Sequence, residues 1–199
     1  MRTDIKRRFN AMYDAWQRFS ERRIALVLLL VWAIAEATVW PILAEFLLVP
    51  LALVRHTRPW ALAGACIAGM AIGGTVTVLV ARSSPDFALE LLRELPLVTG
   101  DHLEGAARQL ADHGVAGFFV QPWSGIPFKA WAVMTGQQGL APWLVIPTFV
   151  SARATRMVLT AGIAHLLGRA LGHRLRDWFA VVVALYLVLF ATGFVAVVL

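Results

Sequence analysis

Apolar runs separated by short polar segments dominate the chain after its first twenty-three residues. A helix needs about 20 apolar residues to cross a hydrocarbon core of roughly 30 Å. Three runs are long enough for that, and they cover residues 60–81, 140–167 and 178–199. The pattern therefore predicts an all-α, polytopic membrane protein with about three full transmembrane helices.

Two further apolar stretches, 24–54 and 115–139, are interrupted by proline, and the pieces on either side are too short to cross the membrane. The first breaks at Pro41, and the second at Ser124 to Pro127. Irregular backbone persists at membrane depth only where it is packed in protein or lines a watery cavity. We interpret both stretches as re-entrant hairpins entering from opposite faces. A hairpin followed by a crossing helix then occurs twice, as an inverted repeat with its site near the midplane.

Two polar regions flank or interrupt these runs. Residues 1–23 are predicted to form a basic amphipathic helix lying on the membrane surface, and the alternative is a disordered basic tail. Its apolar stripe consists of Ile5, Phe9, Met12, Trp16 and Phe19. Residues 82–114 are predicted to form two short helices outside the hydrocarbon, broken near Gly100. Residues 24–199 then form a single transmembrane domain.

Composition and charge support a membrane location and exclude several other classes. The chain is 59% hydrophobic and 15% charged, whereas soluble domains average about 45–50% and about 25%. This excludes a disordered chain, a coiled coil and a DNA-binding domain, so the net charge of +6 does not indicate nucleic acid. Basic residues gather at the ends of apolar runs, which by the positive-inside rule predicts an N-terminus on the cytoplasmic side of the membrane.

Five ionisable residues fall inside the apolar stretches: Glu36, Glu45, Lys129, Arg153 and Arg156. Each costs at least about 2.5–3.5 kcal/mol at the centre of a lone helix, so they must face one another or water. One interpretation is a cavity that binds an anion on the cations and moves protons on the acids. The other is a set of structural ion pairs. The surplus cation favours an anionic ligand.

Three short motifs surround these charges. The first break places Glu45 four residues after Pro41. The second reads Pro127-Phe128-Lys129, with Gly136 seven residues after the lysine. Further on, residues 151–156 place two arginines three positions apart.

In order and spacing these motifs resemble the DedA / VTT-domain family, also called SNARE-associated Golgi protein-like, over about residues 24–175. The chain has Gly125 where a proline is common in that family, and Gln121 to Trp123 where an arginine is usual. The resemblance implies an inner-membrane protein with two re-entrant hairpins that acts as a lipid transporter or scramblase. Recycling of undecaprenyl phosphate by proton-coupled flipping is the best-known bacterial activity. The hairpin tips would comprise Pro41, Ser124, Gly125, Pro127 and Gly136.

The sequence therefore predicts a flippase or scramblase for an anionic polyprenyl phosphate or phospholipid. Lys129, Arg153 and Arg156 would bind the phosphate, and Glu45, with Glu36, would carry a proton. A non-transporting scaffold and a small-ion or proton antiporter are the alternatives. Membrane lipids are the expected partners, and self-association into a homo-oligomer stays open. The chain has no nucleophile–base pattern and no metal-ligand spacing, so we expect neither an enzyme nor a cofactor or metal.

Overall fold

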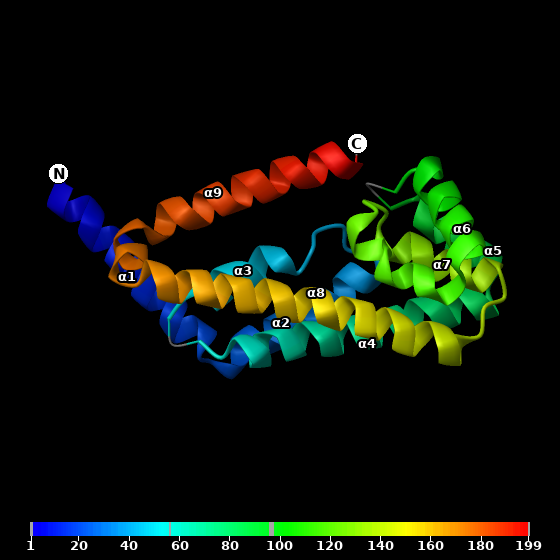
Figure 1. The fold of residues 1–199 in the computed structure, drawn as a ribbon, viewed down its shortest axis with the longest axis horizontal. Coiled ribbons are helices and arrows are strands. Elements are labelled where there is room, and N and C mark those ends of the chain that lie inside the picture. The colour runs from blue at the N-terminus through cyan, green and yellow to red at the C-terminus, as the bar shows by residue number, and fades with distance from the viewer. Residues whose placement is uncertain (1, 56, 96–97, 199) are drawn as a thin grey trace.

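The computed structural model describes residues 2–55, 57–95 and 98–198, with side chains described from Arg7 onward except at a few C-terminal positions. Within these residues every regular element is helical (Figure 1). The elements are α1 (Arg2–Ser20), α2 (Arg23–Thr38), α3 (Glu45–Leu53), α4 (Pro59–Ser83), α5 (Pro85–Arg93), α6 (Gly100–His113), the 3-10 helices η1 (Gly114–Phe119) and η2 (Gln121–Trp123), α7 (Phe128–Gln137), α8 (Pro142–Leu171) and α9 (His173–Val198). The predicted all-α class is confirmed.

Helices α4 and α8 form the frame of the molecule and run antiparallel along its long axis (Figure 1). At one end of the pair, the Arg82 guanidinium in the last turn of α4 donates a hydrogen bond to the carbonyl of Gly139, just before α8, at 3.0 Å. At the other end, the ring of Trp60 near the start of α4 lies beside Gly162. These two contacts fix how α4 and α8 align. A position along α4 can therefore be matched to the position beside it on α8.

Helices α2 and α3 form a hairpin against this frame. Helix α2 packs along α4, and the approach is so close that a Cβ on Gly69 or Gly73 would collide with the α2 backbone. After Thr38 the helix stops, and α3 runs back toward the end where α2 begins (Figure 1). The indole Nε1 of Trp32 donates to the carbonyl of Ile42 at 2.9 Å, which holds the non-helical segment between them.

The second interrupted stretch does not consist of two α-helical halves. Its first half forms η1 and η2, whose i→i+3 hydrogen bonds suit only short pieces, and its second half is α7. Every residue of α7 from Phe128 to Gly136 is buried. Helix α7 packs on α4 and α6, so this segment lies inside the protein near one end of the frame (Figure 1).

The N-terminal helix α1 packs its apolar face on protein. Met12, Trp16 and Phe19 of the predicted stripe contact the core, whereas the side chain of Ile5 lies outside the described residues. Tyr13, which the stripe did not include, is buried and accepts a hydrogen bond from the Arg55 amide at 3.1 Å. Part of this face therefore contacts the first part of α9, and the stripe residues Met12, Trp16 and Phe19 stay partly exposed. That the helix lies on the membrane surface stays a prediction.

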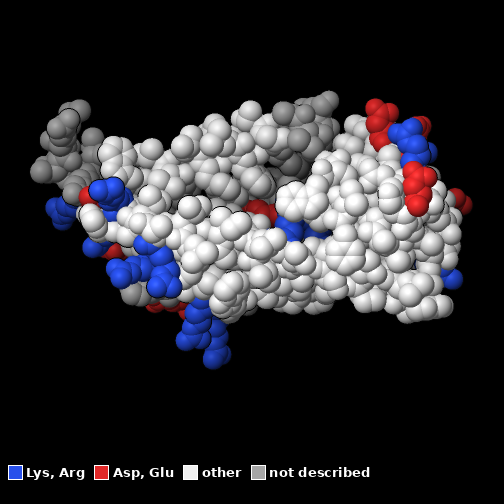
Figure 2. Space-filling model, viewed as in Figure 1, with Lys and Arg blue, Asp and Glu red and all other residues white. Residues whose placement is uncertain are grey.

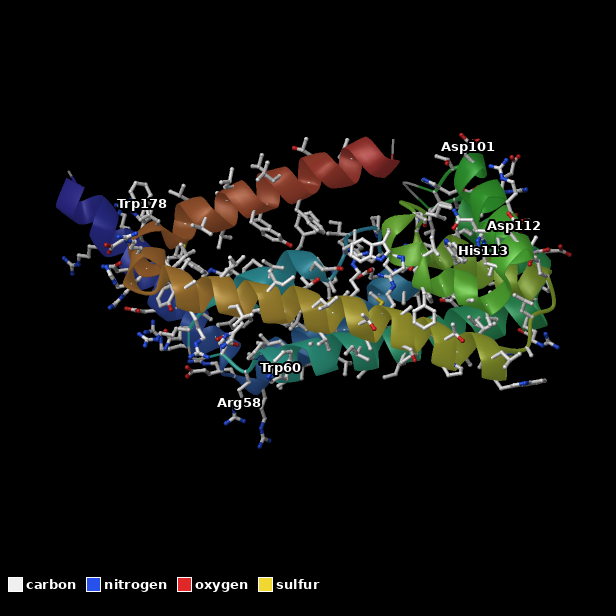
Figure 3. The ribbon with its side chains drawn as sticks, in the orientation of Figure 1. Arg58, Trp60, Asp101, Asp112, His113 and Trp178 are labelled. Atoms are coloured by element: carbon white, nitrogen blue, oxygen red, sulfur yellow. The ribbon has the colours of Figure 1, made fainter. Side chains whose placement is uncertain are left out.

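The two ends of the molecule differ in charge. Helices α5 and α6 form one end, where Figure 3 places Asp101, Asp112 and His113. Figure 3 places Arg58, Trp60 and Trp178 toward the other end, and Figure 2 shows most of the visible basic side chains there. The basic residues thus gather at the end that the sequence analysis predicts to be cytoplasmic.

The start of α6 is capped reciprocally by Thr99 and His102. The Thr99 hydroxyl accepts from the His102 amide, and the His102 ring Nδ1 accepts from the Thr99 amide. Burial lowers the pKa of His102, because desolvation disfavours the charged imidazole. A neutral ring can accept that hydrogen bond, so this environment preserves the cap.

Two described helices are long and apolar enough to cross a membrane: α4, and α9 over 173–193. The prediction of three such helices is therefore met in part. Helix α8 is the longest element at 30 residues, but its middle carries Arg153 and Arg156. Helix α9 begins at His173, five residues before the predicted start of the last span.

Close packing of α8 on α3 makes a sharp stability prediction at Gly168. A Cβ at Gly168 would overlap the carbonyl of Leu53, whereas a Cβ at Gly64 would meet nothing within 4 Å. Replacing Gly168 with Ala should lower the free energy of unfolding by about 1–3 kcal/mol through overpacking. Gly64→Ala should be neutral or stabilising by up to about 1 kcal/mol. Thermal unfolding in detergent compares the two, and equal melting temperatures would contradict the α3–α8 contact.

Candidate functional site

A pocket of about 430 Å³ lies where the two interrupted segments meet. The α2–α3 break, the segment 121–129, the middle of α8 and the second half of α9 supply its walls. Figure 2 shows acidic and basic atoms in a hollow at the middle of the molecule, where the surrounding surface carries no other charged residues in this view. The polar floor is formed by Glu36, Gln121, Lys129, Arg153 and Arg156.

Three of the five charged residues reach this place because a helix begins or ends there, and the other two come from the middle of α8. Glu36 is in the last turn of α2, and Glu45 is the first residue of α3, so the break between them brings both carboxylates to one tip. Lys129 is in the first turn of α7. Arg153 and Arg156 are three residues apart on α8 and therefore share a face. All five residues predicted from the sequence converge in the structure.

Glu36 and Arg153 form the first of two ion pairs. Arg153 Nη1 lies 3.6 Å from Glu36 Oε1, and both side chains are buried. The other oxygen of Glu36 accepts a hydrogen bond from the Ala44 amide at 2.6 Å, just before α3 begins. Glu36 therefore joins α8 to the backbone of the first tip.

Arg156 and Glu45 form the second pair, with Arg156 Nε 2.7 Å from Glu45 Oε1. Arg156 Nη1 also donates to the carbonyl of Pro122 at 3.2 Å. The Glu45 side chain is only 2% exposed, and Glu45 does not line the pocket. Of the two acids, Glu36 alone is therefore in reach of a molecule in the pocket.

Lys129 connects the two tips directly. Its Nζ donates to the carbonyl of Trp40 at 2.8 Å, across from the second break to the first. That carbonyl lies just beyond the end of α2, where helical partners run out. Lys129 thus supplies the hydrogen-bond donor that the Trp40 carbonyl lacks because α2 ends before it.

Arg153 has donors that no described residue satisfies. Its Nε and Nη1 atoms are buried without a hydrogen-bond partner among the described residues, since the contact to Glu36 is too long for a hydrogen bond. The guanidinium lies over the ring of Phe128, 5.2 Å from its centroid, which is a cation–π distance. A buried guanidinium gripped this loosely is able to accept an additional anionic partner.

The second tip is held by its own side chains. Gln121 Nε2 donates to the carbonyl of Ile126 at 2.9 Å, and the Ser124 hydroxyl bonds the carbonyl of Gln121 and the amide of Ile126. Gly125 has a φ of 74°, which favours glycine. A proline, with φ near −65°, could not take this conformation. Ser124, Gly125 and Pro127 therefore lie in the break between η2 and α7.

Two features of the site differ from the sequence analysis. Gly136, grouped there with the tips, lies in the last turn of α7 against the backbone of Ala81, away from the pocket. Tyr186 was missed: its hydroxyl donates to the carbonyl of Glu45 at 2.9 Å. A tyrosine within an apolar run carries no pattern of its own, although its polar hydroxyl marks it as needing a partner.

Comparison with known proteins adds little on function. A Haemophilus influenzae protein described as uncharacterized is 26% identical over 183 residues, which cover 88% of this chain and 94% of the relative. No family model matches the chain, and no solved structure matches it. What is established is a helical protein with two helices able to cross a membrane and a buried charge cluster beside a pocket.

The pairing of the charges predicts which double substitutions restore stability. Arg153→Gln strands the buried Glu36 carboxylate and should lower the free energy of unfolding by roughly 3–5 kcal/mol. Glu36→Gln with Arg153→Gln should recover most of that loss, whereas Glu45→Gln with Arg153→Gln should not. Thermal unfolding of the three variants measures this. Equal recovery in both double variants would mean that the two pairs are not distinct.

Proposed function

We propose that this chain is an integral membrane transporter, a flippase or scramblase, for a lipid with an anionic headgroup such as a polyprenyl phosphate or a phospholipid. The observation that carries the proposal is the pocket between the two tips, whose floor holds three cations and a single acid. Family resemblance in the hairpin motifs supports the same activity.

Depth along α8 supports a site at the middle of the membrane. Exposed Trp143 near the start of α8, and exposed Trp60 beside Gly162, suit the two interfaces where tryptophan is enriched. At about 1.5 Å per residue, Trp143 and Gly162 are roughly 28 Å apart, close to the thickness of a hydrocarbon core. Arg153 is about halfway between them, which is where inverted-repeat transporters place their substrates.

The shape of the pocket suits an amphipathic ligand. Its floor is charged, while the wall formed by α9 offers Leu189, Phe190 and Gly193. With both acids ionised, the five charges sum to one positive charge, which a monoanionic headgroup would neutralise. The two arginines can bind phosphate oxygens through paired hydrogen bonds, and Lys129 can add a third cation.

Either acid could carry the coupled proton. Protonating Glu36 or Glu45 would release its arginine toward an anion, so proton and phosphate would enter the site together. Glu36 is the better placed of the two, because it lines the pocket and Glu45 does not.

A scaffold without transport is the second candidate, favoured by one specific observation. Both arginines already have an acidic partner, and a buried ion pair needs no ligand to explain it. The two candidates differ in whether an arginine remains necessary once its acid is removed.

Membrane placement is tested by labelling single cysteines in a Cys66→Ala background. Arg58→Cys and Arg174→Cys should react with an impermeant maleimide only in inside-out vesicles, because both replace basic residues of the predicted cytoplasmic end. Asp101→Cys should react only on intact cells. Labelling of position 58 from outside would mean that 24–54 crosses the membrane an odd number of times.

Transport is tested by following a polyprenyl phosphate across the bilayer of proteoliposomes. Arg153→Gln should reduce its translocation at least tenfold, and Arg153→Lys should rescue it only in part, because an ammonium lacks the paired donors. Arg174→Gln, at an exposed arginine outside the pocket, is the matched control and should keep the wild-type rate.

The double substitution Glu36→Gln with Arg153→Gln separates the two candidates. A phosphate site predicts a stable but inactive protein, since the guanidinium is gone. A scaffold predicts recovery of both stability and any activity, which would refute the phosphate site.

A further inference from the structure

Helix α9 is attached to the rest of the protein unevenly. Its buried residues are Leu175, Phe179 and Val183 in the first half, and no residue that the structure describes from 184 to 193 is buried. Its most extensive contacts are with α1, and those with α3 and α8 are few. Figure 1 shows α9 running alone along one side of the bundle.

The first half of α9 is clamped to α1. Asp14 accepts a hydrogen bond from the Arg176 guanidinium at 2.6 Å. The ring of Phe179 packs edge-on against Tyr13 with centroids 5.3 Å apart, and Trp16 lies beside it. We call this set of contacts the root of α9.

The second half of α9 reaches α3 through two side chains. The Tyr186 hydroxyl donates to the carbonyl of Glu45 at 2.9 Å. The ring of Phe190 meets Phe46 edge-on, with centroids 4.8 Å apart. We call these two contacts the latch.

The latch closes one wall of the charged pocket. Leu189, Phe190 and Gly193 line that pocket, so moving this half of α9 outward opens the pocket along the side of the molecule. Helix α9 follows α8 after a single residue, Gly172, whose φ of 54° is a glycine conformation. The first half of α9 is therefore held by the root, and the second half is held only by the two contacts of the latch. The charged pocket lies behind that second half.

We propose that α9 is a lateral gate, pivoting at its root and latched by Tyr186 and Phe190, that admits a ligand to the pocket from the side. The ligand's identity as a lipid rests on the proposed function, with its hydrocarbon chain leaving the pocket between α9 and α3. The motion itself does not rest on it. Because Tyr186 bonds the residue that pairs with Arg156, opening the gate also disturbs the charge cluster.

A reversible covalent lock tests the gate in function. In the Cys66→Ala background, Phe46→Cys with Phe190→Cys is joined by a short bis-methanethiosulfonate linker. The lock should slow polyprenyl phosphate translocation at least tenfold, and reduction should restore it. The matched control, Asp14→Cys with Arg176→Cys, locks the root and should leave the rate unchanged. A gate-locked protein with full activity would overturn the proposal.

A distance measurement tests the motion without any ligand. Spin labels at Ile72 and Val188 report on the second half of α9, and labels at Trp60 and Trp178 report on the root; all four side chains are exposed. Tyr186→Phe with Phe190→Ala should shift the open-to-closed ratio about tenfold, adding a longer component to the first distance alone. An unchanged first distance would refute the gate even if the protein moves lipid. If wild type moves no lipid but the first distance lengthens, the proposed function fails and the gate stands.

Discussion

The cost of holding charge in a non-polar interior is the constraint on which the rest of this structure depends. A lone charge at the centre of a membrane helix costs at least about 2.5–3.5 kcal/mol, and four charged residues here are almost fully buried. That cost falls only if the charges meet. Glu36 with Arg153 and Glu45 with Arg156 therefore bring the middle of α8 against the tip formed by α2 and α3, and the pocket is the space that remains beside them.

The same charges also resolve a problem of the backbone. Stopping α2 at Thr38 and starting α3 at Glu45 leaves peptide groups without helical partners. The carbonyl of Trp40 receives Lys129 from the second break, and the amide of Ala44 is accepted by Glu36. In the second segment, the carbonyl of Pro122 accepts a hydrogen bond from Arg156. Each broken segment thus has backbone groups whose hydrogen bonds come from charged side chains. This explains why charged residues gather at helix breaks and why the two breaks lie face to face.

Hydropathy and charge were sufficient to predict the helical class, the two interrupted segments and all five charged residues of the cluster. Long apolar runs mark the helices, prolines within those runs mark the interruptions, and ionisable residues within them mark the cluster. Pairing was not predictable, since Glu36 and Glu45 are equivalent in pattern and only the geometry of the tip assigns Arg153 to one and Arg156 to the other. The covering of α1 was also beyond reach, because an amphipathic stripe is the same whether lipid or Phe179 covers it. Gly136 was misplaced since spacing from Lys129 says nothing of which end of α7 faces the pocket.

The long contact between Arg153 and Glu36 bears on how the proposed ligand would be exchanged. An ion pair with ideal geometry would use the donors of the guanidinium fully. Arg153 Nη1 instead lies 3.6 Å from Glu36 Oε1, and two buried donors of Arg153 have no hydrogen-bond partner among the described residues. The Arg153 guanidinium also lies over the Phe128 ring, and this cation–π contact does not use those donors. In the proposed transporter, an anion entering beside α9 would compete with Glu36 for those donors, and a carboxylate displaced from Arg153 would keep its hydrogen bond from the Ala44 amide. On that proposal, Arg153 can change partner because its contact with Glu36 leaves some of its donors unused.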